Sequence, residues 1–309
     1  MKSIETPEGL LIFDRRTGLN VLFDELKKKD AIWQKPLYVA LAITNRCNRE
    51  CRWCYAASGP GFPVEGFWMR DRVLDLAKAL DEYGVLGLAL GGGEPFTYPR
   101  FANLCRDIWD STGLDVGATT NGDLVTGEDL ETLKGHFGQL RVSVWSEGEI
   151  GKAVKLLGRG VSIGINTLLF RGGFHQVDRI IRAGVAAGIE DFLILSCKPV
   201  GRANGVMTPT REDIDQLALL IRMYPSVAFE VDAAIAMELQ GKSVMFAQPW
   251  IEEGGGSRFA MITHDGFVKP DSFSSHRVKL SSFGDFQSVY NHMRELVGAP
   301  LSSGLMENG

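Results

Sequence analysis

Short apolar runs alternate with amphipathic stretches between residues 37 and 226. Six of these runs are mainly apolar, as expected for strands that are buried on both faces. The predicted strands cover residues 37–43, 85–90, 114–120, 140–145, 161–170 and 191–196. Apolar residues at helical spacing predict helices over residues 69–83, 101–109, 150–157, 177–187 and 212–224.

The regular alternation of strands and helices predicts an α/β fold whose sheet is parallel and whose crossovers are right-handed. A partial (β/α)6 barrel of the TIM type and a doubly wound open sheet fit the periodicity equally well. Six strand–helix units favour the partial barrel. The choice depends on the cysteine-containing loop that follows the first strand.

The two ends of the chain have other patterns. Residues 1–36 predict an N-terminal cap, built as a hairpin or as a strand and a helix. Beyond residue 226, two short strands joined at His264-Asp265-Gly266 predict a β-hairpin, and a final helix is predicted over residues 286–296. We therefore expect a cap (1–36), a barrel (37–226) and a small C-terminal extension (227–309).

Composition narrows the class of protein. The chain has 309 residues, enough for one large α/β domain with an appendage, and its formal charge of -5 argues against broad nucleic-acid binding. No apolar run reaches the roughly 18 residues of a membrane span. The first residues lack the pattern of a signal peptide, so a cytoplasmic protein without membrane contact is expected.

Three of the five cysteines, Cys47, Cys51 and Cys54, lie in the segment CNRECRWC directly after the first predicted strand. Three thiolates from one loop can each bind one iron of a cubane cluster and leave its fourth iron open. A structural zinc ion needs four ligands, and the nearest histidine in the sequence is His136, so zinc is the weaker alternative. The odd number of cysteines argues against a disulfide framework.

The segment resembles the C-x3-C-x-aromatic-C loop of radical S-adenosylmethionine (SAM) enzymes, with Trp53 at the aromatic position and Tyr55 after the last cysteine. This resemblance implies one 4Fe-4S cluster whose open iron chelates the amino and carboxylate groups of SAM. An electron from the cluster would cleave SAM to a deoxyadenosyl radical, which removes a hydrogen atom from the substrate. It also implies a partial barrel with the cofactors at the carboxyl ends of the strands.

Two further segments match the same family. GGGEP, at residues 91–95, follows the second strand, and the resemblance implies that Gly92, Gly93 and Glu94 contact the amino group of SAM. Thr120 and Asn121 end the third strand in a TNG segment that is expected near the cofactor. An ordinary Asn-Gly turn explains that segment equally well.

The later strands supply the remaining candidates. Ser143 and Asn166 are expected to contact the ribose or the methionyl carboxylate, or to be ordinary polar residues of a strand. Arg202, in a GRA turn, is expected near the adenine or in a structural ion pair. Cys197 is a candidate hydrogen-atom donor, with a small buried residue as the alternative.

The C-terminal hairpin resembles the start of a SPASM extension, which is frequent in enzymes that modify ribosomal peptides. In that extension a cysteine follows the pattern I-x-x-D-G-x-V-x-P, whereas here Asp271 follows Pro270 and no cysteine occurs after Cys197. Thiolates are the expected ligands of an auxiliary cluster. We therefore expect a degenerate extension and a single cluster.

The resemblance implies a peptide substrate, in the first place a ribosomal precursor peptide altered by cross-linking, epimerisation or carbon–carbon cleavage, including backbone excision. A separate small leader-peptide-binding protein and an external one-electron donor are the expected partners. Two alternatives stay open. The chain could act on a small molecule such as a nucleoside or sugar, or it could be a scaffold that binds SAM and a cluster without turnover.

Overall fold

The computed structural model describes residues 2–16, 19–23, 35–64, 66–203, 207–239 and 258–298. A parallel run of strands forms its centre: β4 (Tyr38–Thr44), β5 (Gly87–Gly92), β6 (Asp115–Thr120), β7 (Gln139–Ser143), β8 (Ser162–Leu169) and β9 (Asp191–Ser196). These are the six predicted strands, each shifted by no more than a few residues. Neighbours in the sequence are neighbours in the sheet.

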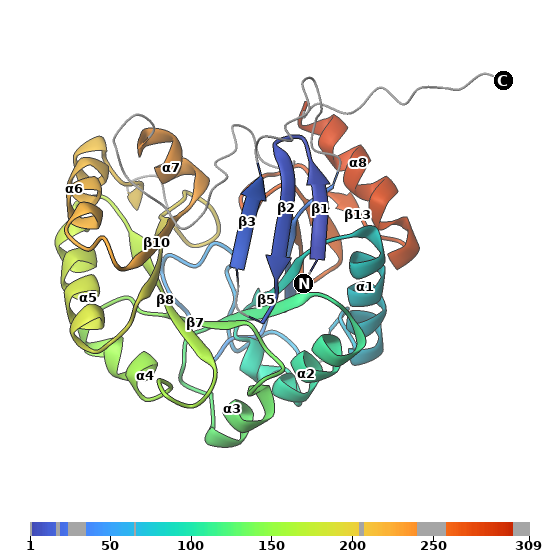
Figure 1. The fold of residues 1–309 in the computed structure, drawn as a ribbon, viewed down its shortest axis with the longest axis horizontal. Coiled ribbons are helices and arrows are strands. Elements are labelled where there is room, and N and C mark those ends of the chain that lie inside the picture. The colour runs from blue at the N-terminus through green and yellow to red at the C-terminus, as the bar shows by residue number, and fades with distance from the viewer. Residues whose placement is uncertain are drawn as a thin grey trace.

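Helices cover the outer side of this curved sheet (Figure 1). They are α1 (Arg70–Tyr83), α2 (Phe101–Ser111), α3 (Gly127–Leu133), α4 (Ile150–Val154), α5 (Phe174–Ala186) and α6 (Arg211–Arg222). Thr126 and Thr210 begin α3 and α6 with capping boxes, because each hydroxyl accepts from a backbone N–H and the aspartate three residues later bonds back. The arrangement confirms the predicted partial barrel. No helix of the described residues has the length and apolar character needed to cross a membrane.

The main sheet extends beyond the six predicted strands at both ends. β10 (Ala228–Val231) pairs in parallel with β9, and α7 (Ala233–Leu239) follows it. At the other end β11 (Phe259–Ile262) pairs in parallel with β4. The antiparallel strands β12 (Phe267–Lys269) and β13 (Val278–Lys279) then complete a sheet of ten strands, and α8 (Phe286–Leu296) follows.

The predicted C-terminal hairpin is therefore present, as β11 and β12, but it continues the barrel sheet. Sequence patterns could not show this, because the pairing joins residues 38–41 to residues 259–262. The seventh parallel strand, β10, was also not predicted. It is a strand of only four residues, AFEV, and its glutamate interrupts the apolar run that marks the longer strands.

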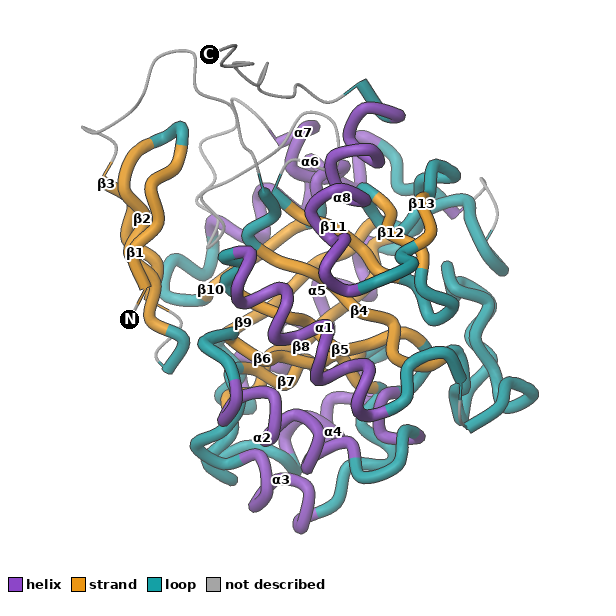
Figure 2. The backbone as a smooth tube through the Cα atoms, turned by 90° about the vertical axis from the view of Figure 1, so that its right-hand side faces the viewer, coloured by secondary structure: helices purple, strands orange, loops and turns teal. Residues whose placement is uncertain are grey.

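An antiparallel sheet of β1 (Lys2–Thr6), β2 (Gly9–Asp14) and β3 (Leu19–Phe23) stands apart from the main sheet (Figure 2). Leu11 and Phe13 pack with residues that directly precede β4 and β5, namely Leu37 and Leu86. Arg15 donates to the carbonyl of Leu114, just before β6. The cap thus covers the amino ends of these strands, opposite the cysteine loop. Residues 24–34 lie outside the described residues.

Alternating residues of each strand point to opposite sides of the sheet. Phe192 of β9 lies against Gly184 of α5, so the face of the sheet that carries Phe192 is the one turned toward the helices. On β8, Gly164 has the side chains of Gln139 and Arg141 over it, and Asn166 lies on the same face. The face turned away from the helices therefore carries the polar residues Arg141, Ser143 and Asn166. These side chains line the inside of the barrel and can form hydrogen bonds with a ligand there.

Asp115, at the start of β6, should make stability depend on pH. Burial raises the pKa of its carboxyl to about 6, although Arg15 opposes the shift. Between about pH 4 and pH 6 the folded state holds a proton that the unfolded state has lost, so the free energy of unfolding falls as pH rises through this range, by about 3 kcal/mol. Asp115→Asn should remove this loss, which urea unfolding at pH 4 and pH 7 can measure.

Asp75→Asn, at an exposed position of α1, is the matched control for that experiment. It should leave the difference between the two pH values as in the wild type. An identical pH dependence for Asp115→Asn and Asp75→Asn would contradict the assignment of the shift to Asp115.

Candidate active site

The cysteine loop begins at the carboxyl end of β4, and backbone hydrogen bonds join its two ends. The N–H of Cys47 donates to the carbonyl of Gly59 (3.1 Å), and the N–H of Gly59 donates to the carbonyl of Asn45 (3.3 Å). The Ser58 hydroxyl donates to the Asn45 side chain over 2.5 Å. These bonds hold Cys47, Cys51 and Cys54 in one compact loop, and all three are free and half-buried.

The three thiols are close enough to influence each other's ionisation. Burial raises the pKa of Cys47, the N–H of Arg49 opposes the shift by donating to its sulfur over 3.4 Å, and Cys51 and Cys54 add to it. Burial likewise raises the pKa of Cys51, with Cys54 adding to the shift. The thiols of Cys47 and Cys51 therefore favour the protonated form, and metal binding would have to release these protons.

The donor set fits a cubane cluster. Within the described part of the chain, no three His, Cys, Asp or Glu side chains converge closely enough to hold a single metal ion. A cubane takes one thiolate for each iron at a separate corner. Three cysteines on one loop offer one thiolate to each of three irons.

The GGGEP loop (residues 91–95), whose first two glycines end β5, lies directly against the cysteine loop. The N–H groups of Gly93 and Glu94 donate to the carbonyls of Thr44 (2.7 Å) and Arg46 (2.8 Å). A Cβ on Gly92, whose φ is +115°, would lie 2.2 Å from the Thr44 carbonyl oxygen, and a Cβ on Gly93 would lie 2.0 Å from that of Arg46. Both glycines are thus required by close backbone approach.

Glu94 joins this loop to the end of β6. One carboxylate oxygen accepts from the Thr120 hydroxyl (2.7 Å) and the Phe96 N–H (3.1 Å), and the other accepts from the Asn121 N–H (2.7 Å). The side chain is 1% exposed. Burial raises the pKa of the carboxyl, while the three donors oppose the shift. The structure therefore gives Glu94 and Thr120 internal partners, and their contact with SAM stays a prediction.

Glu94→Gln should weaken this junction. The amide group replaces one acceptor oxygen by a donor, which would face an N–H or O–H group in a buried place. Leaving such a pair unsatisfied costs about 1–3 kcal/mol. We expect the free energy of unfolding to fall by that amount in urea titrations, with Glu131→Gln, at an exposed position of α3, as the neutral control. Equal stability of Glu94→Gln and Glu131→Gln would show that the donors around Glu94 do not require two acceptor oxygens there.

Asn121 connects the end of β6 with Cys47. Its side-chain N–H donates to the Asn48 side chain (2.7 Å) and points to the Cys47 sulfur at 4.0 Å. Its side-chain oxygen accepts from the N–H of Asp123 (3.0 Å). The structure thus brings Asn121 beside the cysteine loop and shows an Asx turn, while its contact with the cofactor stays a prediction.

Ser143 and Asn166 pair in register on β7 and β8 and face the inside of the barrel. Asn166 is 4% exposed; its N–H group donates to the Thr119 hydroxyl (3.3 Å), while its side-chain oxygen has no partner. Trp53 also has a buried indole N–H without a partner and packs edge-on against Trp145 at 5.9 Å. Unsatisfied buried groups are expected where a ligand binds. The roles of these three residues in cofactor binding stay predictions.

Arg202 holds the second half of the cysteine loop. Its guanidinium donates to the carbonyls of Cys51 (2.8 Å) and Ser58 (2.7 Å), and its N–H donates to that of Cys54 (2.9 Å). A Cβ on the preceding Gly201, whose φ is +64°, would lie 2.3 Å from the carbonyl oxygens of Cys54 and Tyr55. These partners are backbone carbonyl groups and not the carboxylate of the expected ion pair, while the proximity to adenine stays a prediction.

Cys197 and Tyr55 lie at the same end of the barrel. Cys197 directly follows β9 and is 1% exposed, and burial raises its pKa. Tyr55 is exposed and contacts Phe273 of the C-terminal extension edge-on at 5.9 Å. Its role with the cofactor and the donor role of Cys197 stay predictions.

Asp271 stands where a SPASM extension has a cysteine. Its carboxylate accepts from the N–H groups of Phe273 and Ser274, both over 2.6 Å. The next segment packs on the barrel, since Lys198 lies 4.4 Å from the Phe273 ring. The position therefore serves a turn that holds Phe273 near the barrel mouth.

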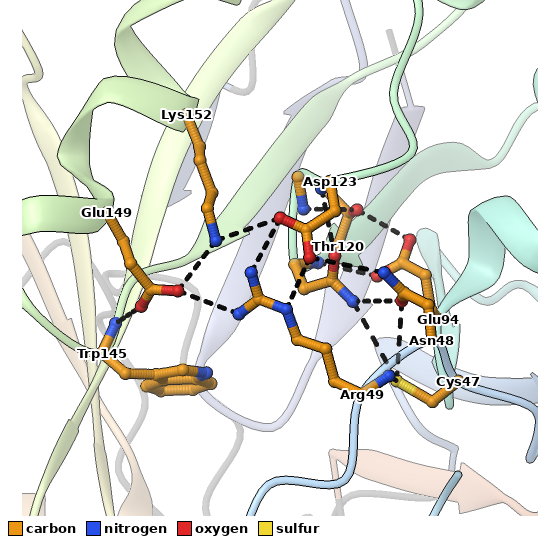
Figure 3. Close-up of polar contacts among 11 residues, drawn as sticks. Cys47, Asn48, Arg49, Glu94, Thr120, Asp123, Trp145, Glu149 and Lys152 are labelled. Atoms are coloured by element: carbon orange, nitrogen blue, oxygen red, sulfur yellow. Dashed lines mark hydrogen bonds and ion pairs between the residues drawn. The ribbon is translucent and has the colours of Figure 1, made fainter. Parts of the chain in front are cut away.

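A group of four charged residues beside the cysteine loop was not predicted from the sequence: Arg49, Asp123, Glu149 and Lys152 (Figure 3). The only sequence signal is that an acidic residue closely follows each of two strands. Burial raises the pKa of Asp123 and Glu149, but hydrogen bonds from Arg49 and Lys152 prevail and hold both below their usual values. Both carboxyls are therefore ionised at neutral pH.

Residues 41–147 match the family model of the Radical SAM superfamily. This region contains the cysteine loop, the GGGEP loop and the end of β6. This region of the chain is therefore similar to the Radical SAM superfamily.

Two relatives in sequence have names that indicate different functions. The GTP 3',8-cyclase of Moorella thermoacetica is 32% identical over 165 residues, 52% of this chain and 46% of that protein. The sporulation killing factor maturation protein SkfB of Bacillus subtilis is 30% identical over 135 residues, 43% of this chain and 32% of that protein. The chain thus spans about half or less of the length of the curated relatives it matches.

Solved structures confirm the fold. Streptococcus suis SuiB superposes with a TM-score of 0.70 at 13% identity, over 93% of this chain and 86% of that chain. The structure of anSMEcpe with AdoMet and the Cp18Cys peptide gives 0.62 at 15% identity, over 85% and 83%. At such identities the likeness concerns the fold.

Proposed function

We propose that this chain is a radical SAM enzyme that binds one 4Fe-4S cluster through Cys47, Cys51 and Cys54 and acts on a peptide. The observation that carries the proposal is the loop of three half-buried thiols against which the GGGEP loop is seated. When bound, the cluster and SAM supply the deoxyadenosyl radical that abstracts a hydrogen atom from the substrate.

The chain's own residues prepare the site. Gly92 and Gly93 bring backbone close to the cysteine loop, and Asn166 and Trp53 offer unsatisfied polar groups at the barrel mouth. Arg202 and Glu94 hold the loops on either side. A site fixed in this way orients its ligands and limits side reactions of a radical.

Two kinds of relative support a peptide substrate. SuiB has been solved bound to its precursor peptide SuiA, with a TM-score of 0.62 to this chain, and SkfB is named for the maturation of a killing factor. The C-terminal extension contributes a surface for such a substrate, since Phe273 lies between Tyr55 and Lys198. A small leader-peptide-binding protein and a one-electron donor belong to the same proposal.

Anaerobic reconstitution tests the enzyme proposal. The purified chain should bind about four irons, and about eight would contradict the single cluster. With dithionite and SAM it should release 5'-deoxyadenosine. A reconstituted protein that binds SAM yet forms none, even with candidate substrates, would instead be a scaffold.

A small-molecule substrate is the second candidate, favoured by the similarity to GTP 3',8-cyclase. Deuterium transfer separates the two. A candidate precursor peptide, deuterated throughout, should pass deuterium to 5'-deoxyadenosine, whereas deuterated GTP should not. Transfer from GTP and none from the peptide would reverse the choice.

A further inference from the structure

The segment between Cys47 and Cys51 is tied to two other strand ends through Arg49. The Nε and one terminal nitrogen of its guanidinium bind the two oxygens of Asp123, over 2.6 and 2.7 Å. The other terminal nitrogen binds Glu149 over 2.9 Å. Every nitrogen of the guanidinium is therefore engaged, and the bidentate pair fixes the direction of the side chain.

Lys152 closes the group, which we call the Arg49 network (Arg49, Asp123, Glu149 and Lys152; Figure 3). Its ammonium lies 3.1 Å from Asp123 and 2.8 Å from Glu149, and the N–H of Trp145 donates to the second oxygen of Glu149 (2.8 Å). Two positive and two negative charges balance. Each side chain is only 21–30% exposed, so water screens these pairs less than pairs at an open surface.

The Arg49 network reaches the sulfur of Cys47 by two routes. The backbone N–H of Arg49 itself donates to that sulfur over 3.4 Å. Asp123 accepts from Asn48 (3.3 Å), and Asn48 accepts from the Asn121 amide, which points to the sulfur at 4.0 Å. Holding the Arg49 side chain therefore also holds the N–H groups that surround Cys47.

N–H groups around a ligating thiolate stabilise negative charge, and a cluster gains one unit of negative charge on reduction. Hydrogen bonds to the sulfurs are one of the factors that set the reduction potential of a cluster. Losing the donors at Cys47 should therefore lower the potential. Partners behind metal ligands also affect how firmly the metal is held.

We propose that Arg49 is a positioning residue: through the Arg49 network it fixes the N–H donors at Cys47, and so controls both the retention and the reduction potential of the cluster. This inference rests on the proposed function, because it requires a cluster on the three cysteines. Arg49 thus holds the first half of the cysteine loop, as Arg202 holds the second half.

Arg49→Gln and Arg52→Gln form a matched pair for the test. Both remove one positive charge from the same loop, but Arg52 is exposed and lies over the Trp53 ring at 5.7 Å. In reconstituted protein without substrate, the rate of iron loss to a chelator should rise about tenfold for Arg49→Gln. Its potential, from a redox titration followed by electron paramagnetic resonance, should become more negative. Arg52→Gln should match the wild type in both.

Asp123→Asn removes the bidentate partner and should shift both readouts in the same direction as Arg49→Gln. Arg49→Lys keeps the charge but loses the planar fork, so it should give a smaller change of the same sign. These variants also decide the matter if Arg49→Gln does not fold. Equal retention and equal potential for Arg49→Lys, Asp123→Asn and the wild type would overturn the inference.

The outcomes separate this inference from the proposed function. A wild-type chain that binds no iron and sulfide contradicts the function itself. A wild-type chain with a stable cluster, together with Arg49 and Arg52 variants that behave alike, contradicts only the role of the Arg49 network. A change in potential for the Arg49 variant alone supports the positioning role, since a loss of fold stability would not shift the potential of the retained cluster.

Discussion

Alanine in place of Cys47, Cys51 or Cys54 should abolish the cluster. Each thiolate is expected to bind a different iron, and only these three cysteines share the loop after β4. With two thiolates left, one iron loses its protein ligand and a cubane is no longer held. Iron and sulfide should fall to background after anaerobic reconstitution, and 5'-deoxyadenosine formation should stop.

The two remaining cysteines supply the controls. Cys105 is fully buried in α2, so its replacement by alanine leaves only a small cavity, at a cost of about 1 kcal/mol, and the cluster should persist. Cys197→Ala should also keep the cluster and the cleavage of SAM. If Cys197 is the hydrogen donor, that variant should change the product formed from the substrate. Retained iron and sulfide in a Cys47 variant would refute the ligand assignment.

The central strands could be predicted because burial on both faces leaves continuous apolar runs in the sequence. Val85–Leu90 illustrates both the strength and the limit of this signal. The strand begins at Gly87 and continues to Gly92. Gly91 and Gly92 carry no hydrophobic signal, so the apolar run ends at Leu90 although the backbone pairing with β4 goes on. Strand pairs distant in sequence, such as β4 with β11, leave no local trace.

Some residues of the site lie in local sequence motifs, and others are brought together from distant parts of the chain. The cysteines and the GGGEP glycines lie in short contiguous motifs, and the sequence identified them. Arg49 contacts Asp123 and Glu149 across 74 and 100 positions of the chain, and no spacing rule connects such residues. Arg202 was identified by its motif, yet its partners proved to be backbone carbonyls of the loop, which no side-chain pattern could reveal.

Gly93→Ala should disrupt the site strongly. The new Cβ would lie 2.0 Å from the Arg46 carbonyl oxygen and 2.9 Å from the carbonyl carbon of Asn45. These are backbone atoms whose position is set by the pairing of β4 and β5, so they cannot turn aside as a side chain would. Overpacking of this kind costs about 3 kcal/mol, and we expect the free energy of unfolding in urea to fall by that amount.

Gly91→Ala provides the matched control two residues earlier in the same loop. A Cβ on Gly91 would meet no atom within 4 Å, so the stability of the fold should hardly change. Cluster retention should separate the variants as well, because moving Gly93 also breaks the bonds from Gly93 and Glu94 to the carbonyls of Thr44 and Arg46. Equal stability and equal iron content in the two variants would show that the GGGEP loop is not seated on the cysteine loop. A defect confined to Gly93→Ala would establish that this contact, and not the motif as a whole, sets the distance between the two loops.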